Sequence, residues 1–307
     1  MYDFTGQDVF YSDGSAIIMK NESDNELKRL KMNEKNLEYL KDNLKYLGFG
    51  EKQNDALEAH LKEGRESFQL TYSAEVNKKP FEAVLQFRKS ENSEMYFLNS
   101  YRSTLERTNG EKMEQTFYLN KGKGVTAKEA YNLLEGRSVH KELTAKNSES
   151  YKAWIKLDFD SKDKNNNYEV KQYHENYGYN LRQSVEKFGV TELDGGEKEK
   201  ALLQSLQKGN LQSVTIGLNG DSQKMFIEAN PQYKTINLYN DKMERLNQGQ
   251  RQEFLQKPET KEAKIQHQEK DQKQDQKQDI KKSVKPKPSD DLDQSKKKKS
   301  RKKGLNA

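Results

Sequence analysis

The chain of 307 residues contains no cysteine, and proline is scarce, with five residues. The lack of cysteine excludes disulfide bonds, thiolate metal sites and cysteine nucleophiles, and it is consistent with a reducing compartment. No hydrophobic run approaches the roughly 20 residues of a membrane-spanning helix, and no apolar segment follows a basic N-terminus as in a secretory signal. We therefore expect a cytoplasmic protein that does not insert into a membrane.

Hydrophobic residues are scarce as well, at 31% of the chain. Ordinary soluble domains contain roughly 45–50% apolar residues, so we expect part of this chain not to pack. The deficit falls near the C-terminus, because the last aromatic residue is Phe254 and three of the five prolines follow it. Residues 1–31 are also expected to form a weakly ordered leader.

The charge is divided unevenly along the chain. The formal net charge is +6, but residues 257–307 alone hold 17 Lys and Arg against 9 Asp and Glu, a net charge of +8. The preceding 256 residues hold 38 basic and 40 acidic residues, a net charge of −2. We therefore expect residues 248–307 to form a low-complexity, disordered basic tail.

The tail ends in a basic block of seven cations: Lys296, Lys297, Lys298, Lys299, Arg301, Lys302 and Lys303. Lysine and arginine neutralise backbone phosphates and release counterions, which gives salt-sensitive affinity without sequence preference. The basic block is therefore the predicted site of nonspecific contact with DNA or RNA. A tail that serves only solubility is the alternative.

Three segments of the body share a pattern of an amphipathic helix, a glycine and a strand. The glycines are Gly64, Gly136 and Gly209, at spacings of 72 and 73 residues. Glycine suits a helix end because it adopts the left-handed conformation without a Cβ clash, and Thr126 with Glu129 has the spacing of a capping box. A fixed period of this kind indicates repeated supersecondary units.

This pattern predicts an α+β fold with an N-terminal helix, three diverged helix–Gly–antiparallel β-meander repeats of period about 72, and the disordered tail. The expected divisions are the leader (1–31), the N-terminal helix with repeat 1 (32–123), repeat 2 (124–188), repeat 3 (189–247) and the tail (248–307). The leucine spacing in the N-terminal helix favours packing on the neighbouring sheet over a coiled coil.

Few side chains are spaced for catalysis. The four histidines lack partners at metal-ligand spacing, so no metal site and no cofactor are predicted. Asp158 and Asp160 could hold Mg²⁺ for phosphodiester chemistry, but a solvated strand end explains them better. Tyr173, Tyr177 and Tyr179 could stack on unpaired bases; packing at a strand–helix junction is the favoured interpretation.

Five stretches carry a resemblance to a known family: Asn33–Lys52, Phe87–Tyr101, Val125–Thr144, Tyr151–Leu181 and Phe226–Tyr239. Over about residues 32–246 the chain resembles an uncharacterised domain family of conjugative transposons and other mobile elements in anaerobic gut bacteria. Related domains occur beside, or fused to, DNA-processing proteins such as topoisomerases. The resemblance implies a role near DNA transfer or maintenance, and it supplies no catalytic residues.

We therefore expect a non-enzymatic accessory protein whose body binds a protein partner of DNA-processing machinery and whose tail contacts DNA or RNA. The alternatives are a protein-interaction module that does not contact nucleic acid, and a Mg-dependent phosphodiester enzyme that uses Asp158 and Asp160.

Overall fold

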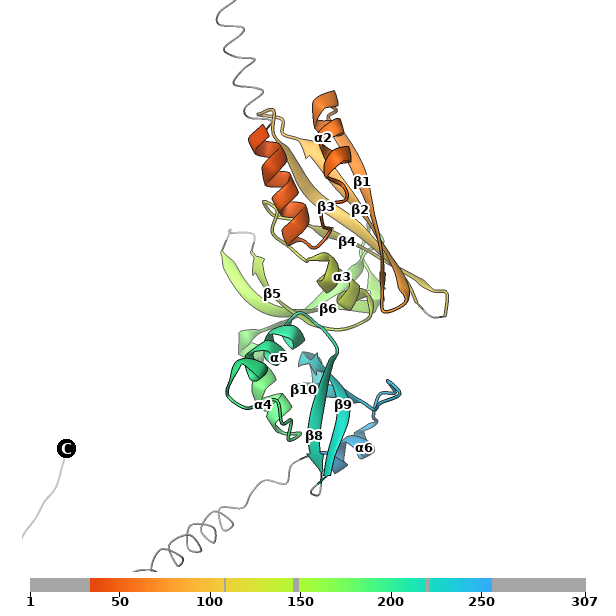
Figure 1. Cartoon of the computed structure of the whole chain (residues 1–307), viewed down its shortest axis with the longest axis vertical. Coiled ribbons are helices and arrows are strands. Elements are labelled where there is room, and N and C mark those ends of the chain that lie inside the picture. The colour runs from red at the N-terminus through yellow and green to blue at the C-terminus, as the bar shows by residue number, and fades with distance from the viewer. Residues whose placement is uncertain (1–33, 108, 146–148, 219–220, 256–307) are drawn as a thin grey trace, which may run out of the picture. The chain divides into compact units, whose positions relative to one another are not determined.

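A computed structural model describes residues 34–107, 109–145, 149–218 and 221–255 (Figure 1). Within these segments the chain forms helices and three antiparallel sheets, which confirms the predicted α+β class. The leader (1–31) and the basic block lie outside the described residues. None of the helices in the described segments is long and apolar enough to cross a membrane.

The first sheet has four strands in the order β1-β2-β3-β4. Their bounds are β1 (Ser67–Val76), β2 (Lys79–Lys89), β3 (Tyr96–Glu106) and β4 (Lys112–Tyr118). Helical residues 34–46 and α2 (Asn54–Glu63) cover one face of this sheet (Figure 1). Asn36 fixes the first helix to β3, because its side chain exchanges two hydrogen bonds with the Tyr96 backbone, at 2.7 and 2.9 Å.

The second sheet has the order β5-β6-β7 and follows the short helix α3 (Ala127–Leu134). Its strands are β5 (Val139–Thr144), β6 (Ser150–Lys162) and β7 (Tyr168–His174). The predicted capping box is present, since the Thr126 hydroxyl accepts from the Glu129 backbone and the Glu129 carboxylate accepts from the Thr126 backbone. This box satisfies two amide donors that the helix itself leaves free.

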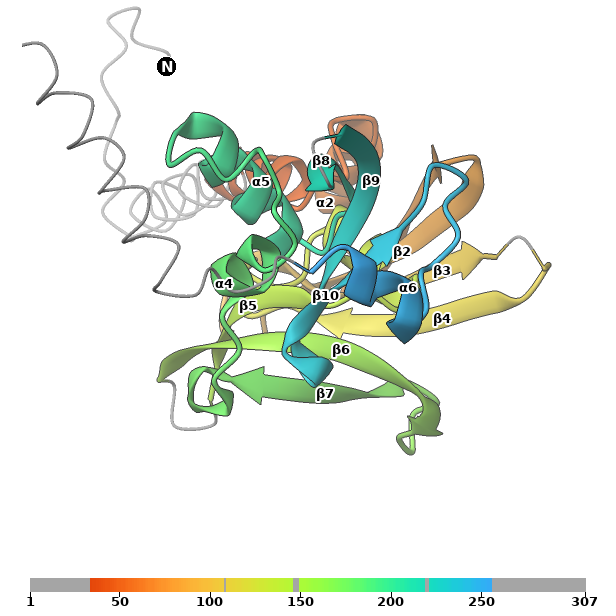
Figure 2. The same ribbon diagram turned by 90° about the horizontal axis from the view of Figure 1, so that it is seen from below.

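The third sheet has the order β10-β9-β8. Its strands are β8 (Gln212–Leu218), β9 (Asp221–Asn230) and β10 (Thr235–Tyr239). The helices around it are η1 (Glu175–Tyr177), α4 (Leu181–Glu186), α5 (Glu197–Gln207), η2 (Pro231–Tyr233) and α6 (Gln248–Glu253). Helix α6 lies against β10 (Figure 2), where the Arg251 guanidinium donates to the Thr235 hydroxyl at 2.8 Å.

The described residues form two hydrophobic cores. The first combines the early helices, the four-stranded sheet and α3 with one face of the second sheet, including Ile155 and Leu157. The second combines α4, α5 and the third sheet with Trp154. Because side chains alternate between the faces of a strand, β6 supplies residues to both cores. The three predicted repeats therefore do not have three separate cores.

The folded body ends later than the sequence predicts. Residues 248–255, assigned to the tail, include α6, and Phe254 is buried in the second core. Asn247 caps this helix in a capping box with Gln250. Residues 248–253 are all polar or glycine, and Phe254, which follows them, packs in the second core. The composition of this segment therefore gives no indication that it is folded. The body comprises residues up to Gln256, and we keep the word tail for residues 257–307.

Candidate functional site

The helix-end glycines adopt left-handed backbone conformations, with φ of 68° at Gly64, 84° at Gly136 and 77° at Gly209. Gly64 is the C-cap of α2 and has open space where a Cβ would lie. Gly209 follows α5, and a Cβ there would lie 2.9 Å from the Ser138 carbonyl oxygen. Gly209 thus allows a close approach between α5 and β5, in addition to ending the helix.

Asp158 is paired with a lysine on the neighbouring strand. Its carboxylate lies 2.8 Å from the Lys171 ammonium, which holds the pKa of Asp158 below its ordinary value. In the segments that the structure describes, no three acidic or histidine side chains are arranged to hold a metal ion. Asp158 is therefore engaged as one half of a cross-strand ion pair, on the face of the sheet that also bears Trp154.

Tyr179 packs inside the body. Its ring meets Trp154 edge-on with centroids 5.3 Å apart, and its hydroxyl donates to the Thr235 carbonyl at 2.9 Å. Burial raises the pKa of this hydroxyl well above its ordinary value. Because both its ring and its hydroxyl are engaged, Tyr179 joins η1 and α4 to the third sheet, as the packing interpretation expects.

Tyr177 is exposed, whereas Tyr173 is partly buried and packs against the second core; their ring centroids lie 5.1 Å apart. The Tyr177 hydroxyl donates to the Gln232 carbonyl at 2.8 Å, which places η2 and its Tyr233 beside this pair. The Lys234 ammonium lies 4.6 Å from the centre of the Tyr177 ring. We call Tyr173, Tyr177 and Tyr233 the tyrosine cluster. Tyr233 is 69% exposed, so the cluster presents an aromatic surface with adjacent positive charge.

The sequence does not indicate that Tyr233 belongs to this cluster, because it lies 56 residues beyond Tyr177 in the chain. The preceding Asn230-Pro231 dipeptide is a turn signal, and it could have indicated that Tyr233 lies on a surface turn. Its nearness to Tyr177 depends on the contact between Tyr177 and Gln232, which are 55 residues apart in the chain, and composition alone does not specify this contact.

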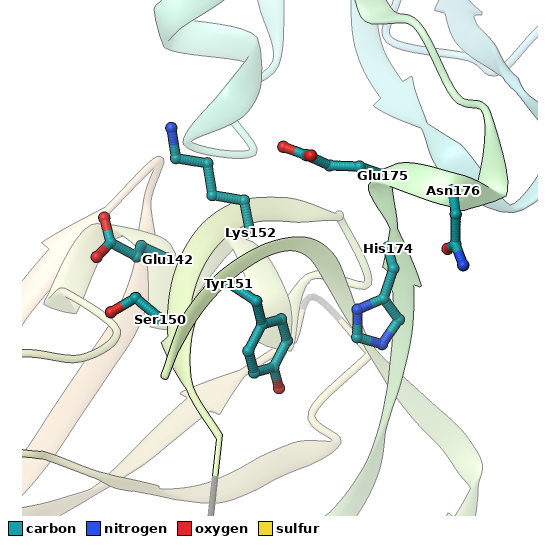
Figure 3. A pocket seen from close by; sticks show the side chains of 7 residues that line it. All are labelled: Glu142, Ser150, Tyr151, Lys152, His174, Glu175 and Asn176. Carbon is teal, nitrogen blue, oxygen red and sulfur yellow. The ribbon is translucent and has the colours of Figure 1, made fainter. Parts of the chain in front are cut away.

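A pocket of about 660 Å³ lies at the edge of the second sheet (Figure 3). Its lining comprises Glu142, Ser150, Tyr151, Lys152, His174, Glu175 and Asn176. The rings of Tyr151 and His174 stack with centroids 5.2 Å apart, and both side chains point to the same side, whereas Lys152 points to the other (Figure 3). The Tyr151 hydroxyl hydrogen-bonds the Gln172 side chain at 3.0 Å.

The pocket contains both acidic and basic side chains, and two of them shift the pKa of the nearby His140. Burial lowers the pKa of His140, Lys152 lowers it further, and Glu175 acts in the opposite direction. His140 therefore stays neutral near pH 7 and packs on Trp154, at 5.2 Å between ring centroids. His140 therefore contacts the second core through Trp154, while charged residues of the pocket affect its pKa.

Comparison with protein-family models, curated proteins and solved structures finds no match to this chain.

Proposed function

We propose that this protein is a non-enzymatic accessory protein of a mobile genetic element, with a body that binds a protein partner and a tail that contacts DNA or RNA without sequence preference. The observation that carries the proposal is the division of charge. The last 51 residues carry a net charge of +8, whereas the body is close to neutral at −2. A tail with a high net positive charge, attached to a nearly neutral body, favours binding to a polyanion.

The tyrosine cluster supports a partner on the body. Tyrosine is enriched at protein interfaces because its ring gives contact area with little loss of rotamer freedom. Tyr177 and Tyr233 are among the exposed large side chains of the described residues, and Lys234 extends the same surface. We assign the part of this surface formed by Tyr177 and Lys234 to the partner of the body.

The mobile-element context and the repeats belong to the same proposal. The context is supported by the resemblance of residues 32–246. The repeats are supported by the order of the elements, since α2, α3 and α5 each precede an antiparallel meander. A common ancestor of the three units would explain their near-equal spacing.

An electrophoretic mobility shift with duplex DNA tests the tail. Three proteins are compared: the full chain, residues 1–256, and a full-length variant in which the seven cations of the basic block are replaced by glutamine. We expect only the full chain to shift duplex DNA at low salt. Unchanged binding by residues 1–256 would show that the tail is not the nucleic-acid contact.

A protein-interaction module without nucleic-acid contact is the second candidate, favoured by the near-neutral body. Affinity capture from cells before and after nuclease treatment separates the two. A direct protein partner survives the treatment, whereas proteins tethered through nucleic acid are lost. Under our proposal, one partner survives and the nucleic-acid-dependent proteins disappear.

A further inference from the structure

Two arginines near the end of the body lack the acidic partners that the others have. The structure describes eight arginines, and six of them pair with a glutamate at 3.9 Å or less: Arg65, Arg88, Arg102, Arg107, Arg137 and Arg182. Among the described residues, Arg245 and Arg251 have no such ion pair. Both line one pocket of about 680 Å³ between η2, β10 and α6.

Hydrogen bonds hold both side chains in place. The Arg251 guanidinium donates to the Thr235 hydroxyl at 2.8 Å, while its Nε is buried and has no hydrogen-bond partner in the described structure. The Arg245 guanidinium donates to the Asn237 side chain at 2.6 Å. Asn237 in turn donates to the buried carboxylate of Glu228 at 2.6 Å, so Asn237 links Glu228 to Arg245.

The Arg251 guanidinium lies 5.5 Å from the centre of the Phe188 ring, but no carboxylate among the described residues pairs with it directly. Burial and the neighbouring Arg245 both lower the pKa of Arg251. A buried donor without a partner also costs free energy, because it has lost its water without gaining another acceptor. An anion bound between the two guanidiniums would relieve both effects.

The side chains that line the pocket indicate which kind of anion it would bind. The planar forks of arginine match the oxygens of a phosphate group. Tyr233 lines the same pocket, and this residue is 69% exposed. Successive bases of a single strand stack on aromatic rings while cations contact the backbone.

We propose that the pocket of Arg245 and Arg251 binds a backbone phosphate of single-stranded nucleic acid, with the adjoining unpaired base on Tyr233. We call this the arginine pocket. It is separate from the basic block of the tail, and it does not depend on the tail function proposed above. The proposal gives the folded body a nucleic-acid contact of its own, restricted to unpaired strands.

The test uses the full-length chain with the seven tail cations replaced by glutamine, so that tail binding does not mask the pocket. The probe is a fluorescent oligothymidylate of about ten nucleotides, followed by anisotropy at low salt. We expect this protein to bind, and Arg251→Gln to weaken binding by at least about tenfold. Arg251→Lys should also weaken binding, because it keeps the charge but loses the fork.

Two matched controls separate the pocket from general charge. Arg88→Gln removes the same charge from an exposed ion pair on the first sheet and should leave binding unchanged. Tyr233→Ala should weaken binding of the oligothymidylate by about fivefold or more, and it should not affect an abasic strand of equal length. Tyr233 is exposed, so this variant keeps the test valid if Arg251→Gln does not fold.

Three results would overturn the proposal. The first is that the chain with the seven tail cations replaced by glutamine fails to bind the oligothymidylate. The second is that Arg251→Gln binds as well as Arg88→Gln. The third is that a phosphotyrosine peptide binds more tightly than the oligothymidylate and depends on Arg251, which would assign the pocket to a phosphoprotein. None of these results bears on duplex binding by the tail, so the two proposals fail independently.

Discussion

Trp154 and Ile155 are consecutive residues of β6, yet their side chains lie in different hydrophobic cores. Ile155 packs with the first sheet and its helices, and Trp154 packs with α4, α5 and the third sheet. The strand is therefore a structural element common to both cores. A change in one core should reach the other through the backbone of β6.

Leu85→Ala tests this coupling, because Leu85 is fully buried in the first core. The truncation should cost roughly 2–5 kcal/mol of unfolding free energy. Trp154 is the only tryptophan of the chain, so its fluorescence reports on the second core. We expect the fluorescence and far-ultraviolet circular dichroism transitions in urea to shift together.

Glu82→Ala is the control, since Glu82 lies exposed on the opposite face of the same strand. It should change stability by no more than about 0.5 kcal/mol. If Leu85→Ala shifts the dichroism transition while the Trp154 transition stays in place, the two cores unfold independently and the coupling through β6 is absent.

Gly209→Ala and Gly64→Ala form a matched pair at two left-handed helix ends. Both should lose roughly 1–2 kcal/mol through backbone strain. Gly209→Ala should lose roughly 1–3 kcal/mol more, because its Cβ would meet the Ser138 carbonyl at 2.9 Å and Val139 at 3.0 Å. Equal losses in chemical denaturation would mean that α5 and β5 adjust to the added methyl group.

His140 gives the fold a pH dependence of known sign. Its pKa in the folded protein lies below the ordinary value of 6.5, through burial and then Lys152. The unfolded chain therefore takes up this proton first, and the free energy of unfolding falls as the pH decreases below about 6.5. His140→Gln should lose less stability than the parent between about pH 7.5 and about pH 5.5.

Lys152→Gln checks the cause by nuclear magnetic resonance titration. Removing the positive charge should move the pKa of His140 upward, toward its ordinary value. Glu175→Gln should move it downward, because the carboxylate favours the charged ring. Shifts of the reverse sign would refute the assignment of these neighbours.

Incubation of supercoiled DNA with the protein and Mg²⁺ tests the non-enzymatic assignment. We expect no nicking. Nicking that is lost in Asp160→Asn would instead support the phosphodiester chemistry that the sequence leaves open for Asp158 and Asp160.

The sequence predicts local features of this fold better than its packing. The Thr126 capping box follows from a local pattern, and it is present. The segment Trp154-Ile155 reads only as apolar, because a strand buried on both faces has no alternation to indicate which core each side chain joins. The strand β4 was missed, because only Met113 and Phe117 are apolar and buried within it.

The candidate site was predictable in part. Tyr173 and Tyr177 are close in sequence and were singled out. Tyr233 joins them through the hydrogen bond of Tyr177 to the Gln232 carbonyl, and Arg251 is held nearby by its hydrogen bond to Thr235; these contacts join residues 55 and 16 positions apart. The lack of an acidic partner for Arg251 is likewise a property of the folded chain, since Glu253 is two residues away in the sequence.

The salt dependence of duplex DNA binding is the most direct test of the proposed function. The logarithm of the association constant should fall linearly with the logarithm of salt concentration. The magnitude of the slope should reach about 6 if all seven cations contact phosphates. Replacing the seven cations of the basic block with glutamine should abolish most of this slope and most of the affinity. If the substituted protein keeps the slope and affinity of the parent, the basic block is not the duplex contact and the account is contradicted.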